Sequence, residues 1–321
     1  MPYPQTFPVV HDPLTPPAGL DGAVVAIGNF DGVHRGHAAV IARAKALAAR
    51  LGKPCAVLTF EPHPADFFSK GSVVFRLTPE AAKARALATL GLDGMIVFSF
   101  DAALSGLSAE EFIAEILVRR LAVSGVVAGY DFHFGKGRSG SPQYLCEAGP
   151  RYGFAVEIVE KIVADEAGSI AAVSSTATRE ALERGDVKAA AQMLGHPFFA
   201  LGPVIKGEQI GRTLGMPTAN IKMDNSSRLR HGIYAVRAKV EGAVYDGVAS
   251  YGRRPTFDNG APLLETYLFD FYGNIYGTTI EIDFYDWIRP ELRFESIEAL
   301  KMQMQDDVRV TKLRLKAHPS S

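Results

Sequence analysis

The sequence predicts two domains of different fold class: an α/β domain built on a parallel sheet, and an antiparallel β-barrel that ends in a helix. The length of 321 residues suggests two domains, at about 150 residues per domain. Short apolar runs alternate with helical patterns up to Gly195, and β-rich runs with turn residues follow. We therefore expect the boundary near residues 196–202, which gives domains at residues 1–196 and 197–321.

In the first domain, uninterrupted apolar runs predict the strands and amphipathic or Ala-rich runs predict the helices. Apolar strands that alternate with helices are typical of a parallel sheet covered on both faces. The first predicted helix stops before Gly52, a residue suited to a helix C-terminus. The predicted strands are Ala23–Ile27, Ala56–Phe60, Met95–Phe98, Val126–Ala128 and Phe154–Val159, and the predicted helices are Gly36–Leu51, Pro79–Leu90, Ser108–Leu121 and Thr176–Arg184.

In the second domain, turn chemistry predicts two hairpins. Glu241-Gly242 separates the predicted strands Gly232–Val240 and Ala243–Ser250. A second turn near Gly273 separates the predicted strands Leu264–Phe271 and Thr278–Trp287. A helical pattern from Ser296 to about Leu315 follows. These elements indicate an antiparallel barrel or sandwich with a C-terminal helix.

The charge balance excludes one broad class of function. The chain has 34 Lys+Arg and 35 Asp+Glu, a formal net charge of −1. This balance excludes a globally basic nucleic-acid binder, although not a local basic groove, and we expect no nucleic-acid partner. Hydrophobic residues at 47% and charged residues at 21% are typical of globular domains.

Cysteine usage and hydropathy predict a cytoplasmic protein without a membrane span. Cys55 and Cys146 are too few for a disulfide framework or a four-thiolate zinc site. Prolines interrupt the N-terminal segment, so we expect no signal peptide. No uncharged apolar run reaches the roughly 18 residues of a membrane helix.

The segment Gly28–His37, with the sequence GNFDGVHRGH, follows the first predicted strand and opens the first helix. His34 and His37 are three residues apart, so they share one face at the helix start. The free N–H groups there, together with close backbone approach at Gly32 and Gly36, suit a polyphosphate. The alternative is a structural turn with two ordinary histidines.

A second segment, Ser174-Ser175-Thr176-Ala177-Thr178-Arg179, stands just before a predicted helix. Hydroxyls and an arginine at a helix start are also suited to phosphate. Ser and Thr are equally common as helix N-caps, so the alternative is a capping role, which is compatible with phosphate binding.

These two segments resemble the signatures of the nucleotidyltransferase superfamily, GxFDGxHxGH and ISSTxxR. The resemblance implies that His34, His37 and Arg179 stabilise charge during attack at the α-phosphorus of ATP. It also implies that neighbouring residues of both segments contact the nucleotide. These are Gly28, Phe30, Asp31, Gly32, Gly36, Ser174, Ser175 and Thr176.

Two further stretches of the first domain are candidate flavin contacts. His63 follows the second predicted strand, and ligands bind beyond the carboxyl ends of parallel strands; the alternative is an ordinary loop residue. The stretch 135–140 matches GxGxxG, but it follows the fourth strand rather than the first, so we reject a dinucleotide fold. The adjoining GYDFHFG resembles a loop of the flavin-adenylating family and makes Asp131 and Arg138 candidates.

The second domain opens with a glycine-rich loop followed by Pro-Thr-Ala-Asn. Gly207, Gly211 and Gly215 allow backbone N–H groups to line an anion site. In an extended segment Thr218 and Asn220 point to one side, and their oxygens are hard ligands suited to Mg²⁺. The alternative is a glycine-rich hairpin with polar surface residues.

Glu265 is a lone acid in the apolar run LLETYLF. Burying such an acid without a partner or role is costly, and partial desolvation would raise its basicity. Glu265 is therefore a candidate general base for a hydroxyl. The alternative is the exposed face of an edge strand, which is the reading that we favour for Asp270, Asp283 and Asp286.

The second domain resembles riboflavin kinase through GRTLGMPTAN, HGIYAVRA, GVASYGRRPTF, LETYLFDFYGNIYG and IRPELRFESIEAL. With the first domain, the resemblance is to the bacterial bifunctional riboflavin kinase/FAD synthetase family. It implies that Thr218 and Asn220 bind Mg²⁺, that Glu265 is the base and that the glycine loop holds ATP. Arg289 is a further candidate flavin contact. Met216 replaces the usual Phe, and Thr178 a β-branched aliphatic residue; neither change removes a chemical group.

The resulting hypothesis is two ATP-dependent reactions, riboflavin to FMN and FMN to FAD, with Mg²⁺ as cofactor. One rival is a nucleotidyltransferase for another phosphate ester, which would not need Pro-Thr-Ala-Asn and Glu265. A second rival is a flavoprotein that stores or senses FMN and never consumes ATP. A regulatory nucleic-acid binder is a third, and the near-neutral charge argues against it.

Overall fold

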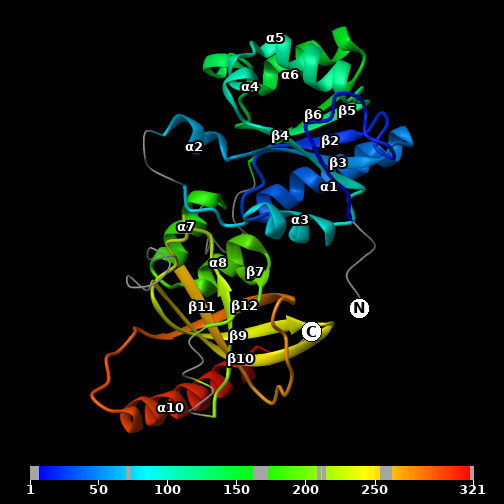
Figure 1. Cartoon of the computed structure of the whole chain (residues 1–321). Helices are drawn as coiled ribbons and strands as arrows, with labels where there is room; N and C mark the ends of the chain where they lie inside the picture. Colours follow the sequence, from blue (N-terminus) through cyan, green and yellow to red (C-terminus); the bar gives the residue numbers. More distant parts are fainter. Residues whose placement is uncertain are drawn as a thin grey trace. The chain divides into compact units, whose positions relative to one another are not determined.

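The computed structural model describes residues 7–69, 74–161, 173–207, 211, 215–253 and 262–318. It divides into two compact units (Figure 1). The sheet unit comprises the described residues of 4–74 and 78–173, and the barrel unit comprises those of 75–77 and 174–321. The two units correspond to the two fold classes that the sequence predicts.

The sheet unit is built on six strands in the order β1-β4-β3-β2-β5-β6, and all neighbours are parallel. All five predicted strands are present. The sequence analysis missed β1, a three-residue strand in the Pro-rich start. The strands are β1 (Val9–His11), β2 (Val24–Ile27), β3 (Cys55–Glu61), β4 (Gly94–Ser99), β5 (Gly125–Gly129) and β6 (Ala155–Val159).

Helices cover both faces of this sheet, with α1 and α3 on one face and α4, α5 and α6 on the other (Figure 1). The predicted first helix is confirmed and ends at Gly52, whose φ of 62° is left-handed. Side chains of η1 and α6 complete the core on the second face. The helices are α1 (Arg35–Leu51), α2 (Pro64–Phe68), α3 (Glu80–Ala88), α4 (Ala102–Gly106), α5 (Ala109–Glu111), the π-helical η1 (Phe112–Arg120), the 3₁₀-helical η2 (Lys136–Arg138) and α6 (Pro142–Tyr152).

The barrel unit is one antiparallel sheet in the order β7-β12-β9-β10-β11-β8. Its two edges approach where Ile205, just after β7, donates its N–H to the Asn220 carbonyl at 2.8 Å. This bridge nearly closes the sheet into a barrel. The strands are β7 (Phe199–Pro203), β8 (Thr218–Lys222), β9 (Gly232–Val240), β10 (Ala243–Arg253), β11 (Pro262–Leu268) and β12 (Thr279–Arg289), and the helices are α7 (Ser175–Glu183), α8 (Val187–Leu194) and α10 (Ile297–Lys316).

One predicted hairpin is confirmed and the other is wrong. Glu241 and Gly242 join β9 to β10 with φ of 50° and 89°, as a tight hairpin turn requires. In contrast, β11 pairs with β10 and β8, whereas β12 pairs with β9 and β7. The connection over residues 269–278 is long enough to pass the β9–β10 hairpin, so turn residues alone did not determine which strands pair.

Helices α7 and α8 pack within the barrel unit. Gly185 lies between them with φ of +82°, and a Cβ there would come within 2.8 Å of the Arg230 side chain. The Arg230 guanidinium stacks on Trp287 of β12, 3.9 Å from the ring centroid. Lys188 of α8 forms an ion pair with Asp286 at 2.9 Å.

The sequence position of the boundary between the two functional domains stays a prediction.

No helix in the described part of the chain combines the length and the hydropathy that crossing a membrane requires.

Asp283 is buried rather than exposed, at 5% of its full accessibility, because β12 is an interior strand. Lys239 of β9 contacts both Asp283, at 3.0 Å, and Glu281. Burial raises the pKa of Asp283; Lys239 and His196 oppose the rise and Glu281 adds to it. The sequence expectation for this residue is therefore wrong, whereas Asp270 is exposed as expected.

We expect Asp283→Asn to stabilise the protein at neutral pH. Because the folded-state pKa is raised, the stabilising contribution of Asp283 is fully present below its unfolded value of 3.8 and is lost as pH rises through the folded pKa. The melting temperature of the variant should match that of the wild type near pH 4 and exceed it increasingly towards about pH 7.

Thermal denaturation across that pH range measures the effect, with the exposed Asp270→Asn as control. A difference between Asp283→Asn and wild type that is constant with pH would contradict the assignment.

Candidate active sites

The loop between β2 and α1, residues 28–34, is called the signature loop below. Phe30, Gly32 and Val33 have φ of 48°, 85° and 44°, in the left-handed region. Such a backbone is unfavourable for Phe and Val and persists only where the surroundings hold it. Phe30 is accordingly buried to 1% exposure. The loop therefore has a fixed shape at the carboxyl edge of the sheet.

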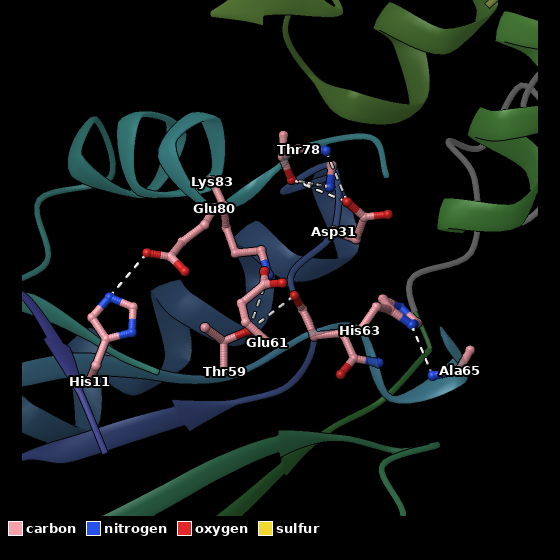
Figure 2. Close-up of polar contacts among 11 residues, drawn as sticks. His11, Asp31, Thr59, Glu61, His63, Ala65, Thr78, Glu80 and Lys83 are labelled. Atoms are coloured by element: carbon pink, nitrogen blue, oxygen red, sulfur yellow. Dashed lines mark hydrogen bonds and ion pairs between the residues drawn. The ribbon is translucent and has the colours of Figure 1, made fainter. Parts of the chain in front are cut away.

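Asp31 fixes one part of this loop. Its Oδ1 accepts a hydrogen bond from the Thr78 backbone N–H at 2.9 Å, and the Thr78 hydroxyl oxygen accepts one from the Gly32 N–H at 2.8 Å (Figure 2). Asp31 and Thr78 are 1% and 2% exposed. These contacts show that Asp31 helps to shape the loop. A nucleotide contact for Asp31 stays a prediction.

His34 and His37 lie together at the start of α1, as their spacing predicts. His34 caps the helix, since its Nδ1 accepts from the His37 N–H at 3.2 Å. The two rings stack with centroids 3.6 Å apart. A Cβ at Gly36 would lie 3.0 Å from the His34 ring, which explains the glycine. Two imidazoles and a helix N-terminus thus meet at one point, an arrangement that suits an anion.

The second predicted phosphate segment belongs to the barrel unit. Ser174 caps α7 by accepting from the Ala177 N–H at 3.1 Å, so the capping alternative describes a contact that is present. Thr178 is fully buried and donates to the Ser174 carbonyl at 2.9 Å. Arg179 Nε donates to the Phe75 carbonyl at 2.7 Å. That Ser175, Thr176 and Arg179 act on the nucleotide of His34 and His37 stays a prediction.

The candidate flavin contacts lie in three places. His63 caps α2, at the carboxyl end of β3, by accepting from the Ala65 N–H at 3.2 Å (Figure 2). Asp131 and Arg138 are both exposed in the loop after β5, where His133 contacts the Asp131 carbonyl at 2.9 Å and the Arg138 guanidinium at 3.2 Å. Arg289 lies in the barrel unit.

Arg289 is held by a two-point ion pair with Asp307 of α10, at 2.7 and 2.6 Å. Asp307 is 4% exposed, so this pair fastens the C-terminal helix to β12. A flavin contact for Arg289 stays a prediction.

The sequence analysis missed a partly exposed aromatic cluster in the sheet unit. Phe67 and Phe68 of α2 are 40% and 67% exposed, and their ring centroids lie 5.6 and 5.7 Å from that of Phe100. Phe100 directly follows β4, so the cluster is at the carboxyl edge of the sheet. The signal was the run Phe60 to Phe68, in which aromatic residues flank His63. Such a surface suits a planar ring.

In the barrel unit, strand register places Glu265 beside Asn220. Glu265 of β11 is the direct partner of Asn220 on β8 and of Ser250 on β10. Directly opposed side chains on antiparallel strands lie about 5 Å apart at Cβ. The edge-strand alternative for Glu265 is wrong, because β11 lies between two strands. Glu265 is partly exposed, as a base that must meet a substrate has to be.

The surroundings of Asn220 fit a small hard cation. Asn220 is 4% exposed, and its buried Oδ1 has no hydrogen-bond donor among the described residues. A Cβ at Gly207 would lie 1.9 Å from the Asn220 amide nitrogen, and one at Gly211 would lie 3.5 Å from the Thr218 methyl. The Asn220 amide therefore packs directly on the Gly207 backbone, whereas the 3.5 Å at Gly211 is an ordinary contact; Gly215 has φ of +78°. The intervening residues 208–210 and 212–214 lie outside the described residues.

Within the described ranges, no group of three or more His, Cys, Asp or Glu side chains could hold a metal. Candidate metal ligation therefore rests on the hydroxyl of Thr218 and the amide of Asn220, with a nucleotide completing the shell.

Two family models match the chain in the order of the two units. The model described as FAD synthetase matches residues 17–177, and the model described as riboflavin kinase matches residues 194–315. The first match lies almost wholly in the sheet unit and contains His34 and His37; the second contains Asn220 and Glu265. The class of protein is therefore a nucleotidyltransferase joined to a flavin kinase.

Curated relatives narrow this class to one family. The chain is 40% identical over 294 residues to the bifunctional riboflavin kinase/FMN adenylyltransferase of Haemophilus influenzae, covering 91% of this chain and 94% of that one. It is 40% identical over 307 residues to the protein of the same name from Listeria monocytogenes, covering 94% and 96%. The chain belongs to the family of bifunctional riboflavin kinase/FMN adenylyltransferases.

A solved structure confirms the fold. A Streptococcus pneumoniae chain described as a macrolide-efflux protein superposes with a TM-score of 0.80 at 29% identity, covering 95% of this chain and 98% of that one. The combination of a parallel sheet unit and a barrel unit thus extends over nearly the full length of both chains.

Proposed function

We propose that this protein phosphorylates riboflavin with ATP to give FMN and adenylylates FMN with a second ATP to give FAD and pyrophosphate. The observation that carries the proposal is the cross-strand pairing of Asn220 with Glu265, which brings a cation ligand and a base together in the barrel unit. Membership of the bifunctional family supports both reactions.

In the kinase reaction, Glu265 accepts the proton of the ribityl 5′-hydroxyl, and that oxygen attacks the γ-phosphorus of ATP. Phosphoryl transfer depends mainly on positioning and charge stabilisation, which fits a site of one base, cation ligands and a glycine-lined loop. Gly207, Gly211 and Gly215 contribute backbone close to the phosphates. FMN and ADP are the products.

Thr218 and Asn220 would hold Mg²⁺, which when bound neutralises charge on the phosphate oxygens. Asn220 Oδ1, which has no hydrogen-bond donor among the described residues, supports this assignment, and Gly207 makes room for the Asn220 amide. The chain's own contribution is to present two neutral oxygen ligands, the Thr218 hydroxyl and the Asn220 amide, beside Glu265.

In the adenylylation reaction, an FMN phosphate oxygen attacks the α-phosphorus of the second ATP, and pyrophosphate leaves. His34, His37 and the N-terminus of α1 stabilise the negative charge that develops on the phosphoryl oxygens. We assign the same role to Arg179, and nucleotide contacts to Gly28, Gly32, Gly36, Ser174, Ser175 and Thr176. His63, Asp131, Arg138 and the aromatic cluster of Phe67, Phe68 and Phe100 form the candidate flavin side.

We place the adenylyltransferase domain at residues 1–196 and the kinase domain at residues 197–321; the limits of the two family matches are compatible with this division. The two free cysteines, one of them buried, accord with the cytoplasmic setting that we predict. A nucleotidyltransferase for another phosphate ester would leave the Asn220–Glu265 pair without a role.

Changing Glu265→Gln should lower the turnover of riboflavin phosphorylation by about 10²–10⁴, because the amide cannot accept the proton. Adenylylation of supplied FMN should stay at the wild-type rate, since His34 and His37 are untouched. Separate assays with riboflavin and with FMN measure the two activities. Kinase turnover that survives the change would refute the assignment of the base.

Changing Gly207→Ala should also impair the kinase reaction selectively. The new Cβ would displace the buried Asn220 amide, and a displacement of about 1 Å can cost about 10²-fold in rate. We expect the KM for Mg·ATP in riboflavin phosphorylation to rise and turnover to fall. Gly106→Ala is the control, because its Cβ meets open space. Equal kinase rates for the two variants would contradict the cation site.

A further inference from the structure

The sheet unit contains a buried lysine that the proposed reaction does not use. Lys83 of α3 is 1% exposed, and its Nζ lies 2.7 Å from Glu61 Oε1 and 3.4 Å from the Thr59 hydroxyl (Figure 2). Lysine is rarely buried without a partner, because removing an ammonium from water is costly. The Lys83–Glu61 ion pair is therefore not explained by packing alone.

The pair lies where the sheet meets the signature loop. Thr59 and Glu61 are alternate residues at the carboxyl end of β3, so both face α3. Thr59 is fully buried, and its hydroxyl donates to the Asn29 carbonyl at 3.1 Å. A chain of polar contacts thus runs from Lys83 through Thr59 to the first part of the signature loop.

The segment that leads into α3 holds the next part of the same loop. Thr78 stands two residues before α3 and contacts Asp31 and Gly32, as described above. The loop is therefore fastened to β3 at Asn29 and to the segment before α3 at Asp31–Gly32, so the distance between these attachments depends on where α3 lies against β3. The left-handed Phe30 and Val33 make the loop strained, so its shape depends on these attachments.

We propose that Lys83 and Glu61 are positioning residues for adenylylation. Their ion pair fixes α3 against β3 and so holds, through Thr59 and Thr78, the loop shape that presents His34 and the α1 N-terminus to the nucleotide phosphates. A buried ion pair is directional, whereas apolar contacts of equal volume would stabilise the fold without fixing the same geometry. The proposal rests on the phosphate site assigned under the proposed function.

The test compares the neutral double variant Glu61→Gln/Lys83→Met with Thr59→Val, which removes only the hydroxyl. Steady-state adenylylation of supplied FMN is measured for each, together with riboflavin phosphorylation and the melting temperature. We expect kcat for adenylylation to fall about 10- to 100-fold in both, because the reacting groups are misplaced. The KM for FMN and the kinase rate should stay within about twofold of wild type.

Two reference variants make the result decisive. Arg119→Met breaks an exposed ion pair with Glu115 in the same unit and should change neither activity. His37→Ala removes a proposed phosphate ligand and should abolish most adenylylation. Should the double variant fail to fold, the single variant Glu61→Gln, which removes the charge of the pair and keeps a hydrogen-bond acceptor for Lys83, takes its place.

Wild-type kcat per folded molecule in the variant that removes the Lys83–Glu61 ion pair, with His37→Ala inactive, would overturn the positioning role and leave the proposed function intact; wild-type kcat in Thr59→Val would overturn the route through Thr59. Full adenylylation by His37→Ala would overturn the phosphate site itself and this proposal with it.

Discussion

The pairing of β8 with β11 is the constraint on which the barrel site depends. Side chains alternate between the faces of a strand, so a slip of one residue would move Asn220 and Glu265 to opposite faces. The Ile205–Asn220 bridge secures β8 from its other side, and the β9–β10 hairpin secures β11 through β10. Register, rather than local loop conformation, therefore brings the proposed base Glu265 and the proposed cation ligand Asn220 together.

In the sheet unit, a loop and a helix N-terminus, rather than strand register, determine where the candidate phosphate-binding side chains lie. Its histidines stand on a strained loop and a helix N-terminus, so their placement depends on what holds the loop. Asp31, Thr59 and Thr78 supply hydrogen bonds, and the buried Glu61–Lys83 pair fixes the helix beside them. Both units thus place the groups that we propose for phosphate binding at points where glycine permits close approach and neighbouring elements fix the geometry.

Local signals were enough to predict the strands of the parallel sheet and the start of α1. The phosphate chemistry of the two segments stays a prediction. Non-local pairing was not predictable. The turn residues near Gly273 suggested a hairpin, yet two strands, β9 and β10, lie between β11 and β12. Asp283 is buried because this arrangement makes β12 an interior strand. The buried position of Lys83 was not predictable, because a lysine on a helix normally faces solvent. Only the fold shows that Lys83 contacts Glu61 and Thr59. The adjacency of Asn220 and Glu265 likewise follows from register, which the sequence pattern does not encode.

We propose that one chain carries two separate ATP-consuming sites that act in sequence on a flavin. The most direct measurement is chromatography of the products formed over time from riboflavin, ATP and Mg²⁺, with a parallel reaction started from FMN. FMN should appear first and FAD after it, and the FMN-started reaction should give FAD without a lag. If neither flavin nucleotide forms, or if supplied FMN is never converted, the account is contradicted.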